Sequence, residues 1–126
     1  SSITAAINVL ANNDGYKILV LGDMAELGEF AVESHQSLGA VIEDCKIDLL
    51  LTFGHLSHHY GHGFTGTHHH LDNKNELNLK LIEQLTNVDA TKKVTVLVKG
   101  SRSAAMESVV EYINNNKNNI GATIQC

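Results

Sequence analysis

The sequence predicts an α/β fold, a Rossmann-like, doubly wound and mainly parallel sheet with helices on both faces. Two apolar runs, residues 17–21 and 94–98, each lead to a glycine and then through a turn into a helical pattern. A third run, residues 47–53, follows the first after a single amphipathic helix, which makes a βαβ unit. Because a crossover helix joins parallel strands, this alternation predicts a sheet of about four parallel strands.

The remaining elements follow from local spacing and turn signals. In the last helical pattern, Met106, Val109 and Ile113 recur at the spacing of one helix face. Asn73, with Glu76 three residues later, is a capping-box variant that marks the start of another helix. We expect helices near residues 2–12, 29–45, 74–88 and 106–113, strands near 17–21, 47–53, 68–71 and 94–98, and an edge strand at 122–124.

Composition limits the classes of protein that this chain can belong to. The chain has 126 residues, which suits one domain, 1–126, with a core of its own. Its formal net charge of −5, with nine scattered Lys and Arg residues, argues against a nucleic-acid partner. The apolar runs are far shorter than the roughly 20 residues that span a bilayer, so we expect no membrane partner. Cys45 and Cys126 lie far apart in the sequence, and a reducing, cytoplasmic setting suits them.

The first strand–turn–helix junction carries carboxylates. Asp23 follows the strand at its carboxyl end, and Glu26 comes three residues later, before Gly28. In open parallel sheets ligands bind at this end of the strands, so both carboxylates are candidates to accept hydrogen bonds from an ammonium group or a ribose hydroxyl. The alternative interpretation is that Asp23 caps the following turn and Glu26 lies in solvent. The G-x-G-x-x-G fingerprint of dinucleotide sites is absent from this junction.

The second junction is basic. Lys99, Gly100, Ser101, Arg102 and Ser103 combine two cations, two hydroxyls and backbone N–H groups before a helix, a set that suits a carboxylate or a phosphate. The alternative is that Ser103 only caps the helix and that the cations are solvated. If both junctions lie on one edge of the sheet, they can hold the two charged ends of a zwitterion. The Walker motif is absent, so this chain alone lacks the usual machinery for splitting ATP.

Histidines form two further groups of candidates. His35 lies on the stripe of its helix that faces the sheet, and it is either a binding residue or a satisfied core histidine. His55, His58, His59 and His62 have the spacing of one helix face, which makes zinc binding an alternative to be weighed. Because this segment lacks an H-E-x-x-H motif and a nearby cysteine, we expect no resident metal site.

The two junctions resemble the C-terminal domain of the Mur ligase family. The resemblance covers nearly the whole chain, and it is strong over residues 1–53 and 93–113 but weak from 54 to 90. The opening residues 1–6 resemble the helix that follows an Asn-Pro hinge in that family, which explains why a helix comes first. The residues that carry the resemblance are 20–24, 26–28, His35, 38–39, 98–103 and 106–107.

The resemblance implies an ATP-dependent, ADP-forming amide ligase of bacterial peptidoglycan synthesis. Its closest member adds D-alanyl-D-alanine to UDP-N-acetylmuramoyl-tripeptide by way of an acyl phosphate. Residues 1–126 are then the C-terminal domain of a three-domain ligase, located in the cytoplasm and inactive in isolation. ATP and magnesium are bound mainly by the other two domains, which also hold the UDP-sugar substrate.

Roles for individual residues follow from the resemblance and from charge. Lys99, Ser101 and Arg102 are expected to hold the carboxylate of the dipeptide or a phosphate. Asp23 and Glu26 are expected to orient the amine or a nucleotide hydroxyl. No catalytic residue is assigned to this domain. The full set of expected substrate- or nucleotide-binding residues is Asp23, Met24, Glu26, His35, Lys99, Gly100, Ser101, Arg102 and Ser103.

Two other classes of function compete with the ligase domain. A stand-alone, flavodoxin-like regulatory or nucleotide-binding module is suggested by the acidic strand end at Asp23. A regulatory module of the receiver-domain type needs several carboxylates at the strand end, and only Asp23 and Glu26 are evident in the sequence. The other class is a metal-binding protein that uses the histidine cluster.

Overall fold

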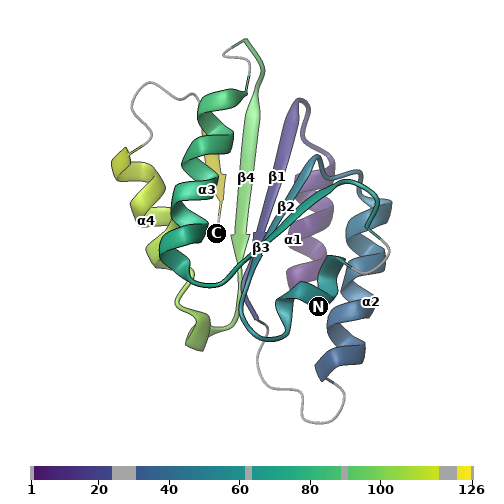
Figure 1. Ribbon diagram of the computed structural model, residues 1–126. Helices are drawn as coiled ribbons and strands as arrows, with labels where there is room; N and C mark the ends of the chain where they lie inside the picture. The colour runs from purple at the N-terminus through teal and green to yellow at the C-terminus, as the bar shows by residue number, and fades with distance from the viewer. Residues whose placement is uncertain (1, 24–30, 62–63, 89–90, 117–121, 126) are drawn as a thin grey trace.

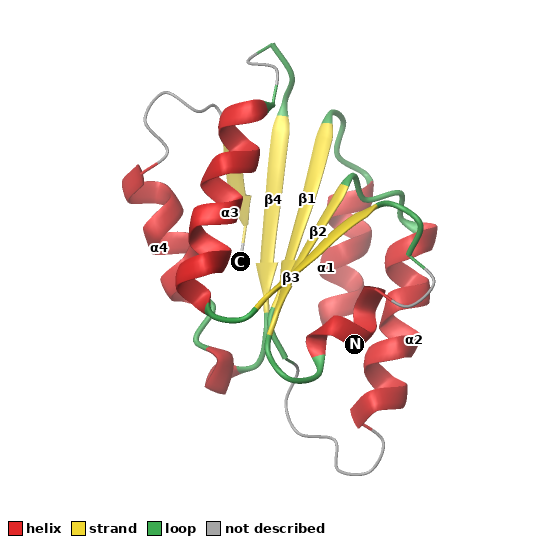
Figure 2. Ribbon diagram, in the orientation of Figure 1, coloured by secondary structure: helices red, strands yellow, loops and turns green. Residues whose placement is uncertain are grey.

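A computed structural model describes residues 2–23, 31–61, 64–88, 91–116 and 122–125. A twisted sheet lies between two layers of helices (Figure 1, Figure 2). The elements in chain order are α1 (Ser2–Ala11), β1 (Tyr16–Leu21), α2 (Ala31–Asp44), β2 (Leu49–Phe53), the 3-10 helix η2 (Ser57–Gly61), β3 (Thr67–Leu71), α3 (Lys74–Asn87), β4 (Val94–Lys99), the 3-10 turn η3 (Arg102–Ala104), α4 (Glu107–Asn116) and β5 (Ala122–Gln125).

The sheet is parallel throughout and has the strand order β3-β2-β1-β4-β5. This confirms the predicted doubly wound α/β class. The predicted number of about four parallel strands was too low, because the four-residue edge strand β5 also pairs in parallel, with Ala122 opposite Val94. So short a strand carries little periodicity of its own. The chain moves from β1 outward to β3 and then returns to the other side of β1, which makes the β1–β4 boundary the switch point of the sheet.

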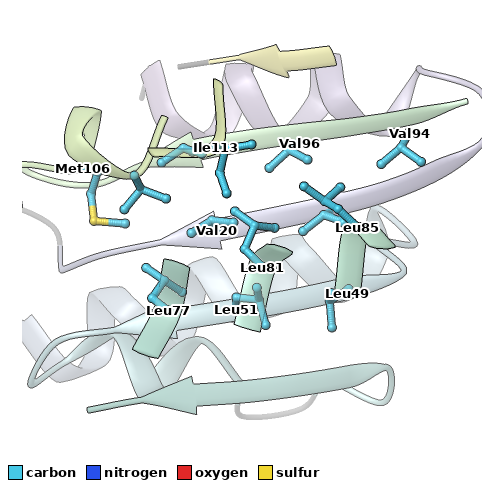
Figure 3. Packing of buried hydrophobic residues seen from close by; sticks show 13 residues of the cluster. Val20, Leu49, Leu51, Leu77, Leu81, Leu85, Val94, Val96, Met106 and Ile113 are labelled. Carbon is cyan, nitrogen blue, oxygen red and sulfur yellow. The ribbon is translucent and has the colours of Figure 1, made fainter. Parts of the chain in front are cut away.

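The strands bury side chains on both faces, which explains their nearly continuous apolar sequences. On one face, Leu77, Leu81 and Leu85 of α3 pack over Val20 and Leu51 of the sheet (Figure 3). Met106, Val109 and Ile113 of the α4 region complete that layer. The other face lies under α1, α2 and η2, whose contributions are Ile3, Ile7, Leu10, Leu38, Ile42 and Tyr60.

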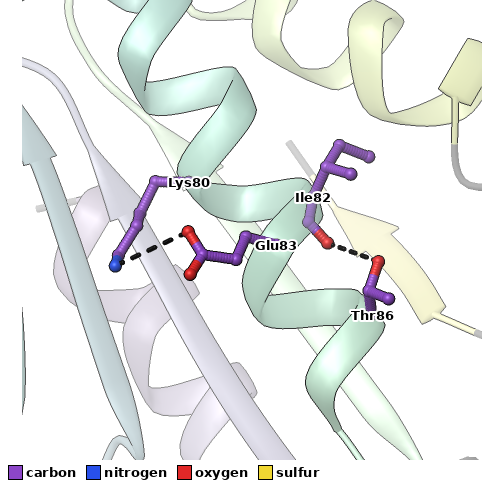
Figure 4. A network of polar contacts seen from close by, with 4 residues as sticks. All are labelled: Lys80, Ile82, Glu83 and Thr86. Carbon is purple, nitrogen blue, oxygen red and sulfur yellow. Dashed lines mark hydrogen bonds and ion pairs between the residues drawn. The ribbon is translucent and has the colours of Figure 1, made fainter.

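Helix α3 begins where the capping signal predicts. The Asn73 side chain accepts a hydrogen bond of 2.9 Å from the backbone N–H of Glu76, and the Glu76 carboxylate accepts one of 3.3 Å from Asp72 N–H. On the outer side of the same helix, Lys80 Nζ lies 3.8 Å from Glu83 Oε2 (Figure 4). An ion pair so exposed contributes about 1 kcal/mol at most, so packing on the sheet stabilises α3. None of the helices in the described part of the chain is long and apolar enough to cross a bilayer.

Two leucines of α3 provide a matched test of this packing. Leu81 is 0% exposed and Leu79 is 55% exposed. We expect Leu81→Ala to lower the free energy of unfolding by about 2–5 kcal/mol, because it leaves a cavity in the core. Leu79→Ala should change it by no more than about 0.5 kcal/mol. Urea unfolding followed by circular dichroism measures both, and equal losses would contradict the described packing of α3.

Candidate functional site

The two charged junctions meet at the switch point of the sheet. Leu21 and Lys99 are opposite one another at the ends of β1 and β4. Beyond them, Gly22 N–H donates a 2.9 Å hydrogen bond to the Lys99 carbonyl, and Ser101 N–H donates one of 2.7 Å to the Asp23 carbonyl. The expectation that both loops lie on the same edge is therefore confirmed.

Two glycines allow a close approach between these loops. A Cβ atom on Gly22 would lie 2.8 Å from Met106 Sδ, and one on Gly100 would lie 2.7 Å from Met106 Cγ. Both distances are shorter than the usual contact between a Cβ atom and a neighbouring side chain. The buried Met106 therefore lies in space that a Cβ atom at either position would enter. The second junction is thereby held against the first.

A cavity of about 400 Å³ opens at this edge of the sheet. The junctions contribute Asp23, Ser101 and Ala104 to its wall. The end of β2 and the two residues after it contribute Phe53, Gly54 and His55, and the end of β3 with the residue after it contributes His70 and Asp72. The polar side chains of this wall are therefore carboxylates, imidazoles and one hydroxyl. Such a lining suits a ligand that donates hydrogen bonds or carries positive charge.

The Asp23 carboxylate is fixed by the loop that follows β2. Its Oδ1 accepts hydrogen bonds from the backbone N–H groups of Leu56 (2.9 Å) and Ser57 (2.7 Å), and its Oδ2 accepts one from His55 N–H (3.0 Å). Gly54 has a φ of +123°, and a Cβ atom there would collide with Asp23 Oδ1. The carboxylate thus caps the start of η2, a partner that the sequence did not indicate. The turn that directly follows Asp23, which the alternative interpretation expected it to cap, lies outside the described residues. The described residues occupy three of the roughly four acceptor sites of a carboxylate.

The basic junction differs from its prediction. Ser101 N–H is engaged by Asp23, and the chain then forms the turn η3 and passes through Ala105, whose φ is 49°. Because α4 begins only at Glu107, Ser103 lies four residues before that helix and not at its N-cap position, so the start of α4 is not beside it as expected. The side chain of Ser103 lies outside what the structure describes.

Neither cation of this junction is among the residues that line the cavity. Lys99 is half-buried and Arg102 is exposed, and in the sequence they stand two residues before and one residue after Ser101. The basic charge of this junction is therefore carried by residues next to a cavity-lining residue and not by the wall itself.

His35 is a core residue. It is 0% exposed, and its ring centroid lies 4.8 Å from that of Tyr60, where α2 packs against η2. This confirms the interpretation of a core histidine and places its ring away from the cavity wall. Burial raises the pKa of the equally buried Tyr60, and the charge of Asp23 raises it further. The sequence analysis missed Tyr60, because one aromatic residue in a histidine- and glycine-rich segment carries no periodic signal.

Three of the remaining predicted residues, Met24, Glu26 and His62, lie outside the described residues. His58 and His59 belong to the five-residue helix η2, where their ring centroids are 4.0 Å apart, so the expected α-helical face of histidines is absent from the described segment. Within the described ranges, no three His, Cys, Asp or Glu side chains are grouped so as to hold a metal ion.

Two cavity residues were overlooked. His70 and Asp72 lie at the carboxyl end of β3, and the rule that drew attention to Asp23 applies equally to them. The short, polar strand β3 made that end hard to recognise in the sequence.

Replacement of Asp23 tests its role as an anchor. We expect Asp23→Asn to lower the free energy of unfolding by about 1–3 kcal/mol. The side chain loses its negative charge, and its NH₂ group, which cannot accept a hydrogen bond, takes the place of the oxygen that faces His55 N–H. Amide hydrogen exchange of residues 55–57 should accelerate at the same time. Asp14→Asn, a change of an exposed carboxylate in the turn before β1, is the matched control and should alter neither. Unchanged exchange in Asp23→Asn would contradict the anchoring role.

Comparison with known proteins identifies relatives over most of the chain. No protein-family model matches the chain. Among curated proteins, it is 46% identical over 112 residues to the UDP-N-acetylmuramoyl-tripeptide–D-alanyl-D-alanine ligase of Buchnera aphidicola from Acyrthosiphon pisum, covering 88% of this chain and 24% of the relative. With the ligase of the same name from Escherichia coli it shares 41% identity over 117 residues, covering 91% of this chain and 25% of the relative.

Solved structures show the same fold. A crystal structure of MurF from Acinetobacter baumannii matches 91% of this chain and 25% of its own with a TM-score of 0.82 and 26% identity. MurF from Thermotoga maritima, in complex with ADP, matches 90% of this chain and 25% of its own with a TM-score of 0.68 and 28% identity. The chain thus spans about a quarter of the length of the relatives that it matches. Along nearly its whole length the chain is thus similar to part of the UDP-N-acetylmuramoyl-tripeptide–D-alanyl-D-alanine ligases, which confirms the resemblance to the Mur ligase family that its two junctions carry.

Proposed function

We propose that residues 1–126 are the C-terminal domain of an ATP-dependent, ADP-forming ligase. Its reaction adds D-alanyl-D-alanine to UDP-N-acetylmuramoyl-tripeptide in peptidoglycan biosynthesis. The observation that carries this proposal is the identity shared along nearly the whole chain with the Buchnera and E. coli ligases. These relatives are bacterial, and we assign the ligase to the bacterial cytoplasm. The relatives do not favour a stand-alone regulatory module.

The cavity at the switch point is the proposed site for the dipeptide. The ammonium group of D-alanyl-D-alanine suits a wall that contains Asp23 and Asp72. Its carboxylate suits Lys99 and Arg102, the cations on either side of Ser101. This arrangement supports binding of a zwitterion with its two ends held by different strand ends. Met24, Glu26, Gly100 and Ser103 remain proposed neighbours of the ligand, whereas His35 contributes through packing.

The described residues do not fit the triphosphate and magnesium of the reaction. Two carboxylates line the cavity and would repel phosphates, and within the described residues no cluster of ligands suits a metal ion. Asp23 can still accept a hydrogen bond from a ribose hydroxyl. The Thermotoga relative binds ADP, which supports a nucleotide as a ligand of the whole ligase. We therefore assign ATP and magnesium mainly to the rest of that protein.

The domain contributes to the reaction by positioning. When an amine attacks an acyl phosphate, holding the amine in a fixed orientation removes a large part of the entropic contribution to the activation free energy. Closure of a domain over the site also excludes water, which would otherwise hydrolyse the acyl phosphate. Neither contribution requires a catalytic residue in this chain, and we assign none. The UDP-sugar substrate is assigned to the rest of the ligase.

A titration of the chain with ligands tests the dipeptide site directly. We expect D-alanyl-D-alanine to shift the backbone amide NMR signals of residues 22–28 and 99–103, because these loops form the proposed site. L-Alanyl-L-alanine is the stereochemical control and should shift them less. Shifts caused by ATP alone would move the assignment of these loops toward the nucleotide.

A chimeric ligase tests the proposed function itself. We expect this chain, placed in the E. coli relative instead of the matching quarter, to support ADP release that depends on D-alanyl-D-alanine and UDP-N-acetylmuramoyl-tripeptide. The 126-residue chain alone should show no turnover. A correctly folded chimera without activity would contradict the proposal.

Within that chimera, one substitution tests the basic junction. Arg102→Gln should raise the KM for D-alanyl-D-alanine about tenfold or more, because it removes a charge-assisted contact to the carboxylate. Lys80→Gln, which removes a surface cation on α3, is the matched control and should leave the KM unchanged. An equal KM in both variants would exclude Arg102 from dipeptide binding.

A further inference from the structure

Two histidines of β3 share one buried hydroxyl group. Thr52 of β2 is 0% exposed, and its Oγ1 lies 2.8 Å from His68 Nε2 and 2.7 Å from His70 Nδ1. Thr52 and His70 are opposite one another in the parallel register. His68 lies two residues earlier on the same strand and so shares a face with His70. One side chain of β2 therefore joins two side chains of the edge strand.

The number of protons on the Thr52 hydroxyl and on each imidazole ring decides which group donates in these hydrogen bonds. A hydroxyl carries one proton, so Thr52 can donate to only one of the two rings. The His70 ring also makes a hydrogen bond with the backbone of Gly54 that raises the pKa of His70, so the ring donates to that carbonyl. Because Nδ1 faces Thr52 Oγ1 at 2.7 Å, the donor to Gly54 is Nε2–H. A neutral imidazole has a single N–H. His70 Nδ1 is then left as an acceptor for the Thr52 hydroxyl, and Thr52 Oγ1 accepts from His68 Nε2–H.

We infer that a directed chain of hydrogen bonds, from His68 through Thr52 and His70 to the Gly54 carbonyl, positions one wall of the cavity and requires the His70 imidazole to be neutral. Gly54 immediately precedes the three N–H groups that hold Asp23, and His70 itself lines the cavity. Thr52 is thus a positioning residue, which acts on the cavity through His70 and the Gly54 turn. The inference concerns the described fold and does not depend on the ligase activity.

Protonation of His70 would disrupt this arrangement of hydrogen-bond donors and acceptors. A proton on Nδ1 would point at Thr52, whose hydroxyl would have to turn and leave its own hydrogen without an acceptor in a buried place. Burial is the largest cause that lowers the pKa of His70, and the nearby His58, whose ring centroid is 5.5 Å away, lowers it further. Asp72 and Asp23 act in the opposite direction.

The same forces act on His68. Burial lowers its pKa most, followed by the charges of His70, His69 and His58. Because both folded-state pKa values lie below the ordinary value of about 6.5, the unfolded chain binds more protons in acid. The stabilisation is complete above about pH 6.5 and is lost as the pH falls through the folded-state values. The cavity wall is therefore expected to loosen in mild acid.

The order of protons is tested first by ¹⁵N NMR of the imidazoles in the unchanged chain at pH 7.5. We expect Nε2–H tautomers for both His68 and His70, with His70 Nδ1 unprotonated. An Nδ1–H tautomer at His70 would overturn the inference. This measurement needs no variant, so it decides the order of protons even if a substitution prevents folding.

The positioning role is tested by Thr52→Val, which keeps the shape of the side chain and removes the hydroxyl. We expect a lower unfolding temperature, faster amide exchange at residues 54–57 and a His70 titration midpoint that rises toward the ordinary value, because the neutral ring loses its donor. Thr52→Ser should restore all three. Thr95→Val is the matched control, since Thr95 is also 0% exposed and its hydroxyl has no hydrogen-bond partner among the described residues. A His70 midpoint that is the same in Thr52→Val and Thr95→Val would overturn the positioning role.

Discussion

The parallel pairing of β1 with β4 is the constraint on which the candidate site depends. These strands are neighbours in the sheet although β2 and β3 lie between them in the sequence. Their register sets Leu21 opposite Lys99, so that the acidic and the basic junction emerge side by side. Gly22 and Gly100 then let Met106 pack between the loops. A slip of register would separate the two charges and close the space between them.

The second structural link is the carboxylate of Asp23. Backbone N–H groups compensate its charge locally, which is the usual condition for holding an anion where water is partly excluded. The same contact joins the end of β1 to the start of η2. Tyr60, within η2, packs on His35 of α2. The site therefore combines a cavity lined by acceptors with a neighbouring junction that carries two cations, a combination that suits a zwitterionic ligand.

The edge strand β3 shows how a polar sequence can be held in a sheet. Three consecutive histidines supply little apolar area, and the strand is only partly buried. Thr52 compensates for this by bonding His68 and His70 from the neighbouring strand. Because the same hydroxyl serves both rings, the edge of the sheet and the cavity wall respond together to any change in either ring.

Much of this fold could be predicted, because its signals are local. Apolar spacing located the helices, Asn73 located the start of α3, and the rule that βαβ units are parallel brought Asp23 and Ser101 to one edge. The edge strand expected at residues 122–124 is confirmed as β5, whereas the turn η3 carried no such signal. Nor did the sequence indicate that Asp23 binds residues 55–57, because those partners are 32 to 34 positions away.

The sequence by itself thus determined the alternation of strands and helices, their parallel direction and the charge carried by each junction, since each depends on near neighbours in the chain. Only the tertiary structure decided which backbone N–H groups hold Asp23, that neither cation is in the cavity wall and that Thr52 joins two histidines. Those features depend on distances between segments that the sheet order alone brings together.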